Sequence, residues 1–370
     1  MWLSSFFSTL QSVVTLIRSR ILTLALFVAS AYLIISCEKQ PIGDGCCDLL
    51  PLSADADSHG VLHVAGSTSA TYTAISAEGV EYGPTFLNEP LILPEGHYTV
   101  HTGASSHSVN IVAGMETRCA TGTLVISGNA PDTYSVADTV GRTVSQRINR
   151  ALSLFPGTYR VVVNRTTTWA NVSPGQWTKV RTGTLLVKGG TRENYYVLDN
   201  DNHQLVDNTL GRPAALMPGK YTVKVNNTSL GVEVVAGQIH EYATGSVLVR
   251  GLTDEFYYVT DTLSRKLNYR PLNQPLALFP GSYVATINNS AQRIEVVPDS
   301  TLTFETGTLV LTGAGQEYFS VIDPAGRELH SSTFNRPVSL FPADYTVKLG
   351  NTLRNTTVNP RTNTSLEAFH

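Results

Sequence analysis

A repeat that runs through most of this chain constrains its fold more than any other sequence feature. Each copy opens with a Gly-x-Leu/Val-x-Val/Leu motif, and successive openings are 62, 61, 62 and 62 residues apart. The opening glycines are Gly60, Gly122, Gly183, Gly245 and Gly307. A second landmark, a tyrosine in or just after a Pro-Gly turn, keeps the same spacing at Tyr98, Tyr159, Tyr221, Tyr283 and Tyr345. Two landmarks in register predict five copies of one structural unit.

Each copy has the pattern of short β-strands joined by tight turns. In the third copy, residues 185–187, 195–198, 221–225 and 232–234 are rich in β-branched and aromatic residues, and Pro-Gly and Asn-Asn turns separate them. The charged fraction is only 15%, with 29 Gly and 18 Pro, which suits strands and turns. The predicted fold is therefore all-β: five tandem, small, Ig-like or transthyretin-like β-sandwich repeats in a rod, after an N-terminal signal helix.

The repeat spacing also predicts the segment boundaries. These are a signal peptide at 1–36, a tether at 37–58, and repeats at 59–120, 121–181, 182–243, 244–305 and 306–370. A unit of this size buries too little apolar surface to be very stable alone. No Gly/Ser-rich or Pro-rich spacer separates the copies, so we expect neighbouring repeats to pack against each other as a stiff rod.

A third landmark is an aspartate that opens a turn in four copies, with Ser76 in the first. The four are Asp138, Asp199, Asp261 and Asp323. One carboxylate per turn is suited to capping backbone amides. No second acid recurs beside it, which argues against a paired-carboxylate hydrolase and a calcium loop. P-loop, Gly-x-Ser-x-Gly, His-Glu-x-x-His and dinucleotide-binding motifs are also missing. The sequence predicts no enzyme and no cofactor.

The order of these motifs resembles the PEGA-type and related transthyretin-like repeats of bacterial envelope proteins. Between Thr182 and Gly237 it runs Thr-Gly-x-Leu-x-Val, Tyr-x-Val-x-Asp, Pro-x-x-Leu-x-Pro-Gly-x-Tyr-x-Val-x-Val and Val-x-Val-x-x-Gly. The resemblance covers residues 60–369, although the turn differs in copy one (Pro94-Glu95-Gly96) and copy five (Pro342-Ala343-Asp344). It implies a non-catalytic spacer or binding module on the cell envelope.

The N-terminal segment resembles the leader of a bacterial lipoprotein. Arg18 and Arg20 are the only charged residues before an apolar run, Ile21–Leu33, that is short for a membrane span. The sequence Ile34-Ile35-Ser36-Cys37 that follows resembles a lipobox, which implies acylation of Cys37. The alternative is a signal-anchor helix with an incidental cysteine. Glu38 takes the place of the aspartate that often signals inner-membrane retention, so the resemblance favours the outer membrane.

Histidine is concentrated in the first repeat, which contains five of the nine: His59, His63, His97, His101 and His107. His97 and His101 share one face of a predicted strand, and His63 replaces an apolar residue of the later copies. Neutral imidazoles suit zinc or copper, so these three are the weak candidates for a metal site. His97 and His101 would also be the candidates for a hydrolase. The alternative is a membrane-proximal repeat with a polar outer face.

Three cysteines follow Cys37, which is an odd number for an oxidising compartment. Cys119 occupies a position that is Val, Tyr or Phe in the next three copies, and this favours a buried thiol. A disulfide from Cys46 or Cys47 to Cys119 is the alternative, and it would fasten the tether to the first repeat.

Four copies have a large apolar residue just before the Pro-Gly turn or its equivalent: Phe155, Met217, Phe279 and Phe341. Packing between neighbouring repeats would explain them. If they are exposed instead, they form a contact row for a protein or glycan.

Together these features predict a non-enzymatic, lipid-anchored envelope protein, a repeat stalk for adhesion or for protein or glycan binding at the cell surface. The alternative is a periplasmic scaffold or sensor component that spaces a partner complex from the outer membrane. The expected membrane contact is the lipid on Cys37, on either side of the outer membrane. A net charge of -3 gives no indication of a nucleic-acid partner.

Overall fold

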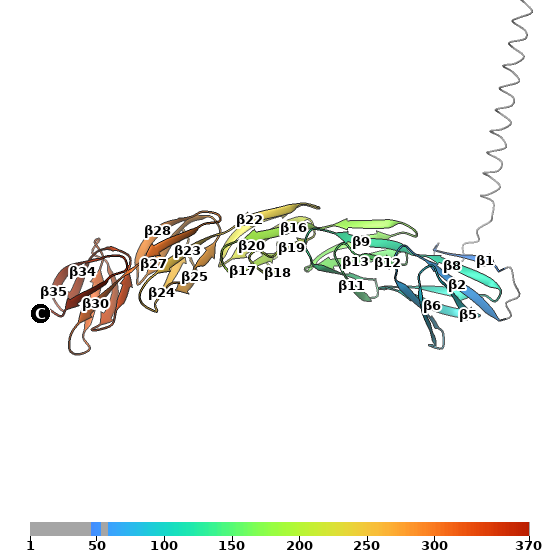
Figure 1. The fold of residues 1–370 in the computed structure, drawn as a ribbon, viewed down its shortest axis with the longest axis horizontal. Coiled ribbons are helices and arrows are strands. Elements are labelled where there is room, and N and C mark those ends of the chain that lie inside the picture. Colours follow the sequence, from blue (N-terminus) through green and yellow to red (C-terminus); the bar gives the residue numbers. More distant parts are fainter. Residues whose placement is uncertain (1–45, 53–57, 370) are drawn as a thin grey trace, which may run out of the picture. The chain divides into compact units, whose positions relative to one another are not determined.

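The computed structural model describes residues 46–52 and 58–369, and the regular structure in these residues is entirely β-strand. The predicted leader and Cys37 lie outside the described residues. The described strands form sheets that pair into five tandem β-sandwiches, which confirms the predicted fold class (Figure 1). The chain divides into two compact units, one ending at Thr121 and one comprising Gly103–Ser105 and the residues from Gly122 onward.

The first unit contains the first sandwich. Its strands are β1 (Cys47–Pro51), β2 (His59–Ala65), β3 (Thr71–Ser76), β4 (Glu81–Phe86), β5 (Pro90–Pro94), β6 (Gly96–Thr102), β7 (Ser105–Ile111) and β8 (Met115–Ala120). One sheet has the order β1-β8-β2-β5 and the other β4-β3-β6-β7.

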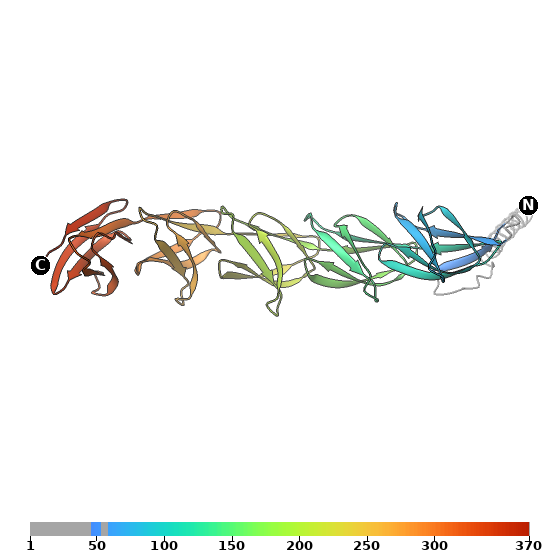
Figure 2. The same ribbon diagram turned by 90° about the horizontal axis from the view of Figure 1, so that it is seen from below.

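The second unit contains four sandwiches that share one topology (Figure 2). The second repeat has β9 (Gly122–Ser127), β10 (Thr133–Ala137), β11 (Thr143–Arg147), β12 (Ala151–Leu154), β13 (Gly157–Val163), β14 (Thr166–Val172) and β15 (Trp177–Arg181). The third has β16 (Gly183–Lys188), β17 (Asn194–Leu198), β18 (Gln204–Thr209), β19 (Ala214–Leu216), β20 (Gly219–Val225), β21 (Thr228–Val234) and β22 (Ile239–Ala243).

The remaining strands repeat this order. The fourth repeat has β23 (Gly245–Arg250), β24 (Phe256–Thr260), β25 (Lys266–Pro271), β26 (Leu276–Leu278), β27 (Gly281–Ile287), β28 (Ser290–Val296) and β29 (Thr301–Glu305). The fifth has β30 (Gly307–Thr312), β31 (Tyr318–Ile322), β32 (Glu328–Thr333), β33 (Val338–Leu340), β34 (Ala343–Leu349), β35 (Thr352–Val358) and β36 (Asn363–Glu367).

Within each repeat the opening strand pairs with the closing strand. In the third repeat β16 lies between β19, which is antiparallel to it, and β22, which is parallel to it with Thr184 opposite Ile239. The second sheet is an antiparallel meander of order β18-β17-β20-β21. Because the parallel pair joins the two ends of the repeat, a sandwich is complete only when all seven strands are present.

The opening glycine is required by a close backbone approach. A Cβ atom on Gly245 would lie 2.2 Å from the Val297 carbonyl oxygen and 2.7 Å from the Val296 side chain. The opening glycine of every other copy meets backbone oxygen at a similar distance. A side chain at this position would therefore push apart the start of one strand and the end of another.

The repeated tyrosine closes its own turn. The Tyr221 hydroxyl donates a hydrogen bond of 2.7 Å to the carbonyl oxygen of Met217, four residues earlier. The corresponding bonds in the other copies are 2.6 to 3.0 Å long. A second tyrosine lies in the core, where Tyr195 donates to the Arg212 carbonyl oxygen at 2.7 Å, and burial raises the pKa of Tyr195 to about 12.

The repeated aspartate caps its turn, as predicted. Asp261 Oδ1 accepts backbone N–H bonds from Leu263 and Arg265, both at 2.9 Å, while Oδ2 accepts one from the Arg265 guanidinium at 2.6 Å. The backbone hydrogen bond from Arg265 is the main cause that lowers the pKa of Asp261. Asp138 and Asp199 accept the same pair of backbone hydrogen bonds, from the residues two and four positions later. Asp323 accepts the backbone hydrogen bond from the residue four positions later, Arg327.

Side chains of one repeat clamp the edge of the next within the second unit. Glu193 Oε2 accepts the Ala277 N–H at 2.6 Å, and Asn226 Nδ2 donates to the Ala277 carbonyl oxygen at 2.9 Å. Thr228 Oγ1 accepts the Phe279 N–H at 3.2 Å. The outward-facing backbone groups of β26 are therefore paired by side chains of the preceding repeat, in place of a further strand.

The same clamp occurs at two more junctions. Between repeats two and three, Asp132 accepts the Ala215 N–H (2.6 Å), Asn164 donates to the Ala215 carbonyl oxygen (3.0 Å) and Thr166 accepts the Met217 N–H (3.0 Å). Between repeats four and five, Glu255 accepts the Ser339 N–H (2.8 Å), Asn288 donates to the Ser339 carbonyl oxygen (3.0 Å) and Ser290 accepts the Phe341 N–H (3.2 Å). In sequence, the first repeat has Ala70 and Gly103 at the positions of the acid and the asparagine. The first repeat keeps only the third group, since Ser105 Oγ accepts the Phe155 N–H at 2.9 Å, so the complete set of three groups belongs to repeats two, three and four.

The proposed contact row is buried, so it is not available to a protein or glycan. Phe155, Met217, Phe279 and Phe341 are 1%, 5%, 4% and 4% exposed. Met217 lies in the core of the second repeat, Phe279 in that of the third and Phe341 in that of the fourth. Each of these three side chains fills the core of the repeat before its own. The alternative interpretation, packing between neighbouring repeats, is correct for Met217, Phe279 and Phe341.

Candidate functional site

The first sandwich includes a strand that the sequence analysis assigned to the tether. β1 pairs antiparallel with β8, from Cys47 opposite Cys119 to Pro51 opposite Met115. A disulfide of 2.03 Å joins Cys47 to Cys119 across 72 residues of sequence. Of the two partners that the sequence left open for Cys119, the structure uses Cys47, which lies directly opposite it. Residues 47–51, Cys-Asp-Leu-Leu-Pro, do not alternate between polar and apolar and end in proline, so the sequence pattern does not reveal a strand.

Cys46 lies next to this disulfide. Its Sγ atom is 3.8 Å from Cys47 Sγ and 3.3 Å from His107 Nε2, and the residue is 6% exposed. The three side chains form a group whose ligand atoms lie within 4.8 Å of one another. With Cys47 in the disulfide, the group lacks the second thiolate that a thiolate-rich metal site would use.

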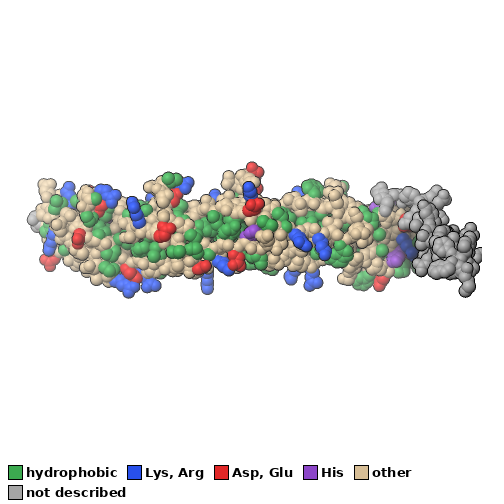
Figure 3. Space-filling view, turned by 90° about the horizontal axis from the view of Figure 1, so that it is seen from above, with side chains coloured by type: hydrophobic (Ala, Val, Ile, Leu, Met, Phe, Trp, Pro, Cys, Tyr) green, Lys and Arg blue, Asp and Glu red, His purple; other side chains and the backbone are tan. Residues whose placement is uncertain are grey.

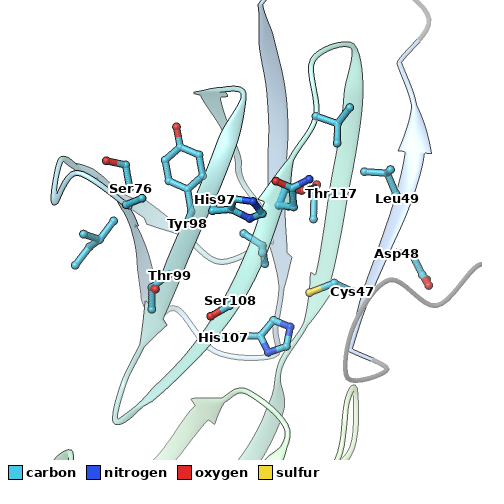
Figure 4. A pocket seen from close by; sticks show the side chains of 15 residues that line it. Cys47, Asp48, Leu49, Ser76, His97, Tyr98, Thr99, His107, Ser108 and Thr117 are labelled. Carbon is cyan, nitrogen blue, oxygen red and sulfur yellow. Dashed lines mark hydrogen bonds between the residues drawn. The ribbon is translucent and has the colours of Figure 1, made fainter.

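A cleft of about 480 Å³ lies beside β1 in the first unit. Figure 4 shows Cys47 and Leu49 of β1 on one side of it and His97 and Tyr98 of β6 on the other. Thr117 of β8 and the β7 residue His107 complete this part of the wall. The cleft thus combines two imidazoles, hydroxyl groups and short apolar side chains, which suits recognition by hydrogen bonds and contact.

The structure does not bring His63, His97 and His101 together as metal ligands. Among the described residues, no group with ligand atoms within 4.8 Å of one another contains these three. His63 is on β2 and the other two are on β6, which belong to different sheets. His63 Nδ1 instead lies 3.3 Å from Glu116 Oε1, and the hydrogen bond from Arg118 is the main cause that lowers the pKa of Glu116.

A different group of candidate ligands, which sequence reasoning missed, lies in the turn after β17. Asp199, Asp201 and His203 have ligand atoms within 4.8 Å of one another. Asp199 Oδ1 already accepts the backbone N–H groups of Asp201 and His203, and its Oδ2 is 3.2 Å from His203 Nδ1. His203 replaces the arginine that occupies this position in repeats two, four and five. The group therefore performs the capping role of the other turns.

Charged side chains are scattered over the face drawn in Figure 3, between hydrophobic and uncharged ones. No single-sign field on this face points to nucleic acid. None of the described segments forms a helix with the length and apolarity that a membrane span requires.

No protein-family model matches the chain, and no curated protein matches it. Among solved structures it is similar to the TIE protein of Bacillus anthracis at 12% identity, covering 72% of this chain and 73% of that one, with a TM-score of 0.17. It is similar to the pilus adhesin SpaC of Lactobacillus rhamnosus GG (10% identity, 87% and 56% covered, TM-score 0.15). It is also similar to a variant of BcpA, the major pilin subunit of Bacillus cereus, at 10% identity, covering 84% of this chain and 99% of that one, with a TM-score of 0.17. The chain thus spans little more than half of the SpaC chain.

Proposed function

We propose that this protein is a non-enzymatic, lipid-anchored stalk of the bacterial envelope, acting in adhesion or in protein or glycan binding. The observation that supports this most directly is the clamp repeated at three junctions of the second unit. Each clamp satisfies the edge of a short strand with side chains of the preceding repeat. Covering an open edge in this way prevents unwanted strand pairing and fixes the orientation of neighbouring sandwiches.

The packing at these junctions agrees with a load-bearing role. Met217, Phe279 and Phe341 each cross into the core of the repeat before, so neighbouring repeats share apolar surface. In a repeat array, stability then depends on interfaces as much as on each unit. Separating two repeats would expose a large apolar side chain and break three hydrogen bonds, so the array resists bending at its junctions.

The resemblance of Ile34-Ile35-Ser36-Cys37 to a lipobox supports attachment at Cys37. In this proposal a thioether-linked lipid and an N-terminal acyl chain hold the first repeat at the membrane, because several acyl chains bind stably where one binds weakly. The resemblance to PEGA-type repeats supports the same non-catalytic role. The cleft beside β1 supplies the recognition surface of the first repeat.

Attachment is tested by metabolic labelling with palmitate. The full chain should be labelled and the Cys37→Ala variant should not, with both present at comparable abundance. Equal labelling of the two would refute the anchor and favour the signal-anchor helix.

The side of the membrane is tested by protease treatment of intact cells. Cleavage of the repeats on intact cells, with a periplasmic marker left uncut, is expected for a surface stalk. Complete protection until the outer membrane is permeabilised would contradict surface display and favour the periplasmic scaffold.

A further inference from the structure

One sheet edge in each repeat of the second unit is open among the described residues. The smaller of the two sheets in each of repeats two to five has three strands, and it ends at β15, β22, β29 or β36. In the first repeat the same position is held by β8, and β1 is added beyond it as a fourth strand. The chain itself therefore shows that this edge accepts an antiparallel strand.

The β1–β8 pair indicates which backbone groups face outward. The Ala120 N–H donates to the Cys46 carbonyl oxygen at 2.9 Å, so Ala120 points its backbone groups toward the added strand. Ala243 occupies the position of Ala120 in the third repeat, two residues before the opening glycine. The neighbouring Thr244 N–H donates to Lys188 at 2.8 Å, on the side of β16. Backbone groups alternate along a strand, so those of Ala243 face away from the sheet.

The third repeat differs from the other three at one position of this edge, although β22, like β29 and β36, carries one acidic residue, Glu241. At the position of Ala120 and Ala243, repeats two, four and five have Arg181, Glu305 and Glu367. Charged side chains at an edge discourage the addition of another strand. Repeat three thus shares its small residue with the one repeat in which an added strand is seen.

A hollow of about 520 Å³ adjoins this edge. It is lined by Leu230, Tyr242 and Ala243, together with Phe279 and Tyr283. By repeat register, Leu230 corresponds to His107 and Tyr242 to Cys119, the residues that contact Cys46 and Cys47 in the first repeat. The space that the start of β1 fills in the first repeat is therefore open in the third.

We propose that the outer edge of β22 binds an extended segment of a partner protein by strand addition, antiparallel to β22. The β1 register gives the side chains that fit. In the partner segment, an apolar residue enters the hollow beside Leu230, and the next residue, which is small, lies opposite Tyr242. A cationic or neutral residue then lies opposite Glu241, and an aliphatic residue lies opposite His240. Glu241 is half exposed and pairs with Lys188 at 2.5 Å, and an acidic residue opposite it would place two like charges side by side.

This proposal rests on the proposed binding role of the repeats and adds the partner's chemistry and the edge it uses. It does not depend on the lipid anchor. Failure of peptide binding would leave the palmitate and protease experiments unaffected, so the two proposals fail separately.

The test uses the full chain in detergent and a synthetic, end-blocked peptide of residues 46–52 with Cys46→Val, Cys47→Ala and Asp48→Lys. We expect saturable binding by fluorescence anisotropy and at least tenfold slower hydrogen exchange of residues 239–243 when the peptide is bound. The same peptide with Asp retained at its third position should bind several-fold more weakly. No saturable binding, or equal protection of residues 363–367, would overturn the proposal.

Two variants test the edge itself. Ala243→Arg places a charge where the second repeat has Arg181, and Ala243→Pro removes the outward N–H; each should abolish binding. Proline is tolerated at edge positions whose N–H faces solvent. The matched control, Glu367→Pro in the fifth repeat, should bind like the unchanged chain. Retained binding by both Ala243 variants would refute a partner strand at this edge. Protection of residues 239–243 that grows with protein concentration in the absence of peptide would also refute it, and would assign the edge to a second copy of the chain.

Discussion

The junction between repeats four and five offers a sharp test of the clamp. Glu255 Oε2 accepts the Ser339 N–H at 2.8 Å, and Glu255 Oε1 accepts a hydrogen bond from Asn288 Nδ2 at 2.8 Å. Ser339 is 0% exposed, so Glu255→Ala leaves its N–H without this acceptor in a dry environment. A buried donor without a partner costs about 1–3 kcal/mol, and hydrogen bonds to charged groups are at the upper end. We expect the junction to lose about 2–3 kcal/mol.

Native-state hydrogen exchange measures this loss at the affected amide. Each 1.36 kcal/mol corresponds to a tenfold change in rate. A loss of about 2–3 kcal/mol should therefore raise the exchange rate of the Ser339 N–H about 30- to 150-fold. Glu317→Ala is the matched control, because Glu317 is the corresponding residue of the fifth repeat and is exposed. It should leave the Ser339 N–H unchanged. Equal exchange rates in Glu255→Ala and the unchanged chain would refute the clamp.

Three further predictions concern the fold. Gly245→Ala should lower the free energy of unfolding by about 1–3 kcal/mol through steric overlap, whereas Gly231→Ala, where a Cβ meets nothing within 4 Å, should not lower it in urea titrations. Reducing the Cys47–Cys119 disulfide, which closes a long loop, should destabilise the first repeat by about 2–4 kcal/mol; a Cys47→Ser variant whose thermal midpoint still shifts with reductant would contradict this. The pKa of Asp261 is lowered in the folded chain, so its contribution is complete above the unfolded pKa of about 3.9 and is lost as the pH falls through the folded value. Asp261→Asn, compared by acid titration, should remove that part of the pH dependence, and an unchanged acid transition would contradict the assignment.

The fold could be predicted because the same local constraints recur five times. The glycine at the start of each opening strand, the tyrosine after each turn and the aspartate that opens a turn in four of the copies are read directly from the sequence. The structure gives each a local cause: a backbone oxygen near the missing Cβ, a carbonyl four residues back, and two backbone amides. The Asn226-Asn227 turn also has both φ angles positive, 47° and 63°, as expected of residues that tolerate this region.

The candidate site was harder to predict, because its features depend on which strands lie side by side. β1 is five residues long in a segment rich in turn formers, and only its pairing with β8 shows that it is a strand. The choice of Cys47 over Cys46 follows from that register. His63 and His97 are separated because β2 and β6 lie in different sheets. The acidic and asparagine side chains of the clamps look like ordinary turn residues until the next repeat is placed beside them.

The clamps are expected to hold the repeats of the second unit in a fixed orientation, and a distance between two repeats tests this expectation. Nitroxides attached through unnatural amino acids at the exposed residues Thr167 and Leu353 report the separation of the second and fifth repeats by pulsed dipolar spectroscopy. A fixed orientation gives one narrow distance distribution, which broadens when Glu193 and Glu255 are both changed to alanine. A broad distribution in the unchanged chain would contradict it.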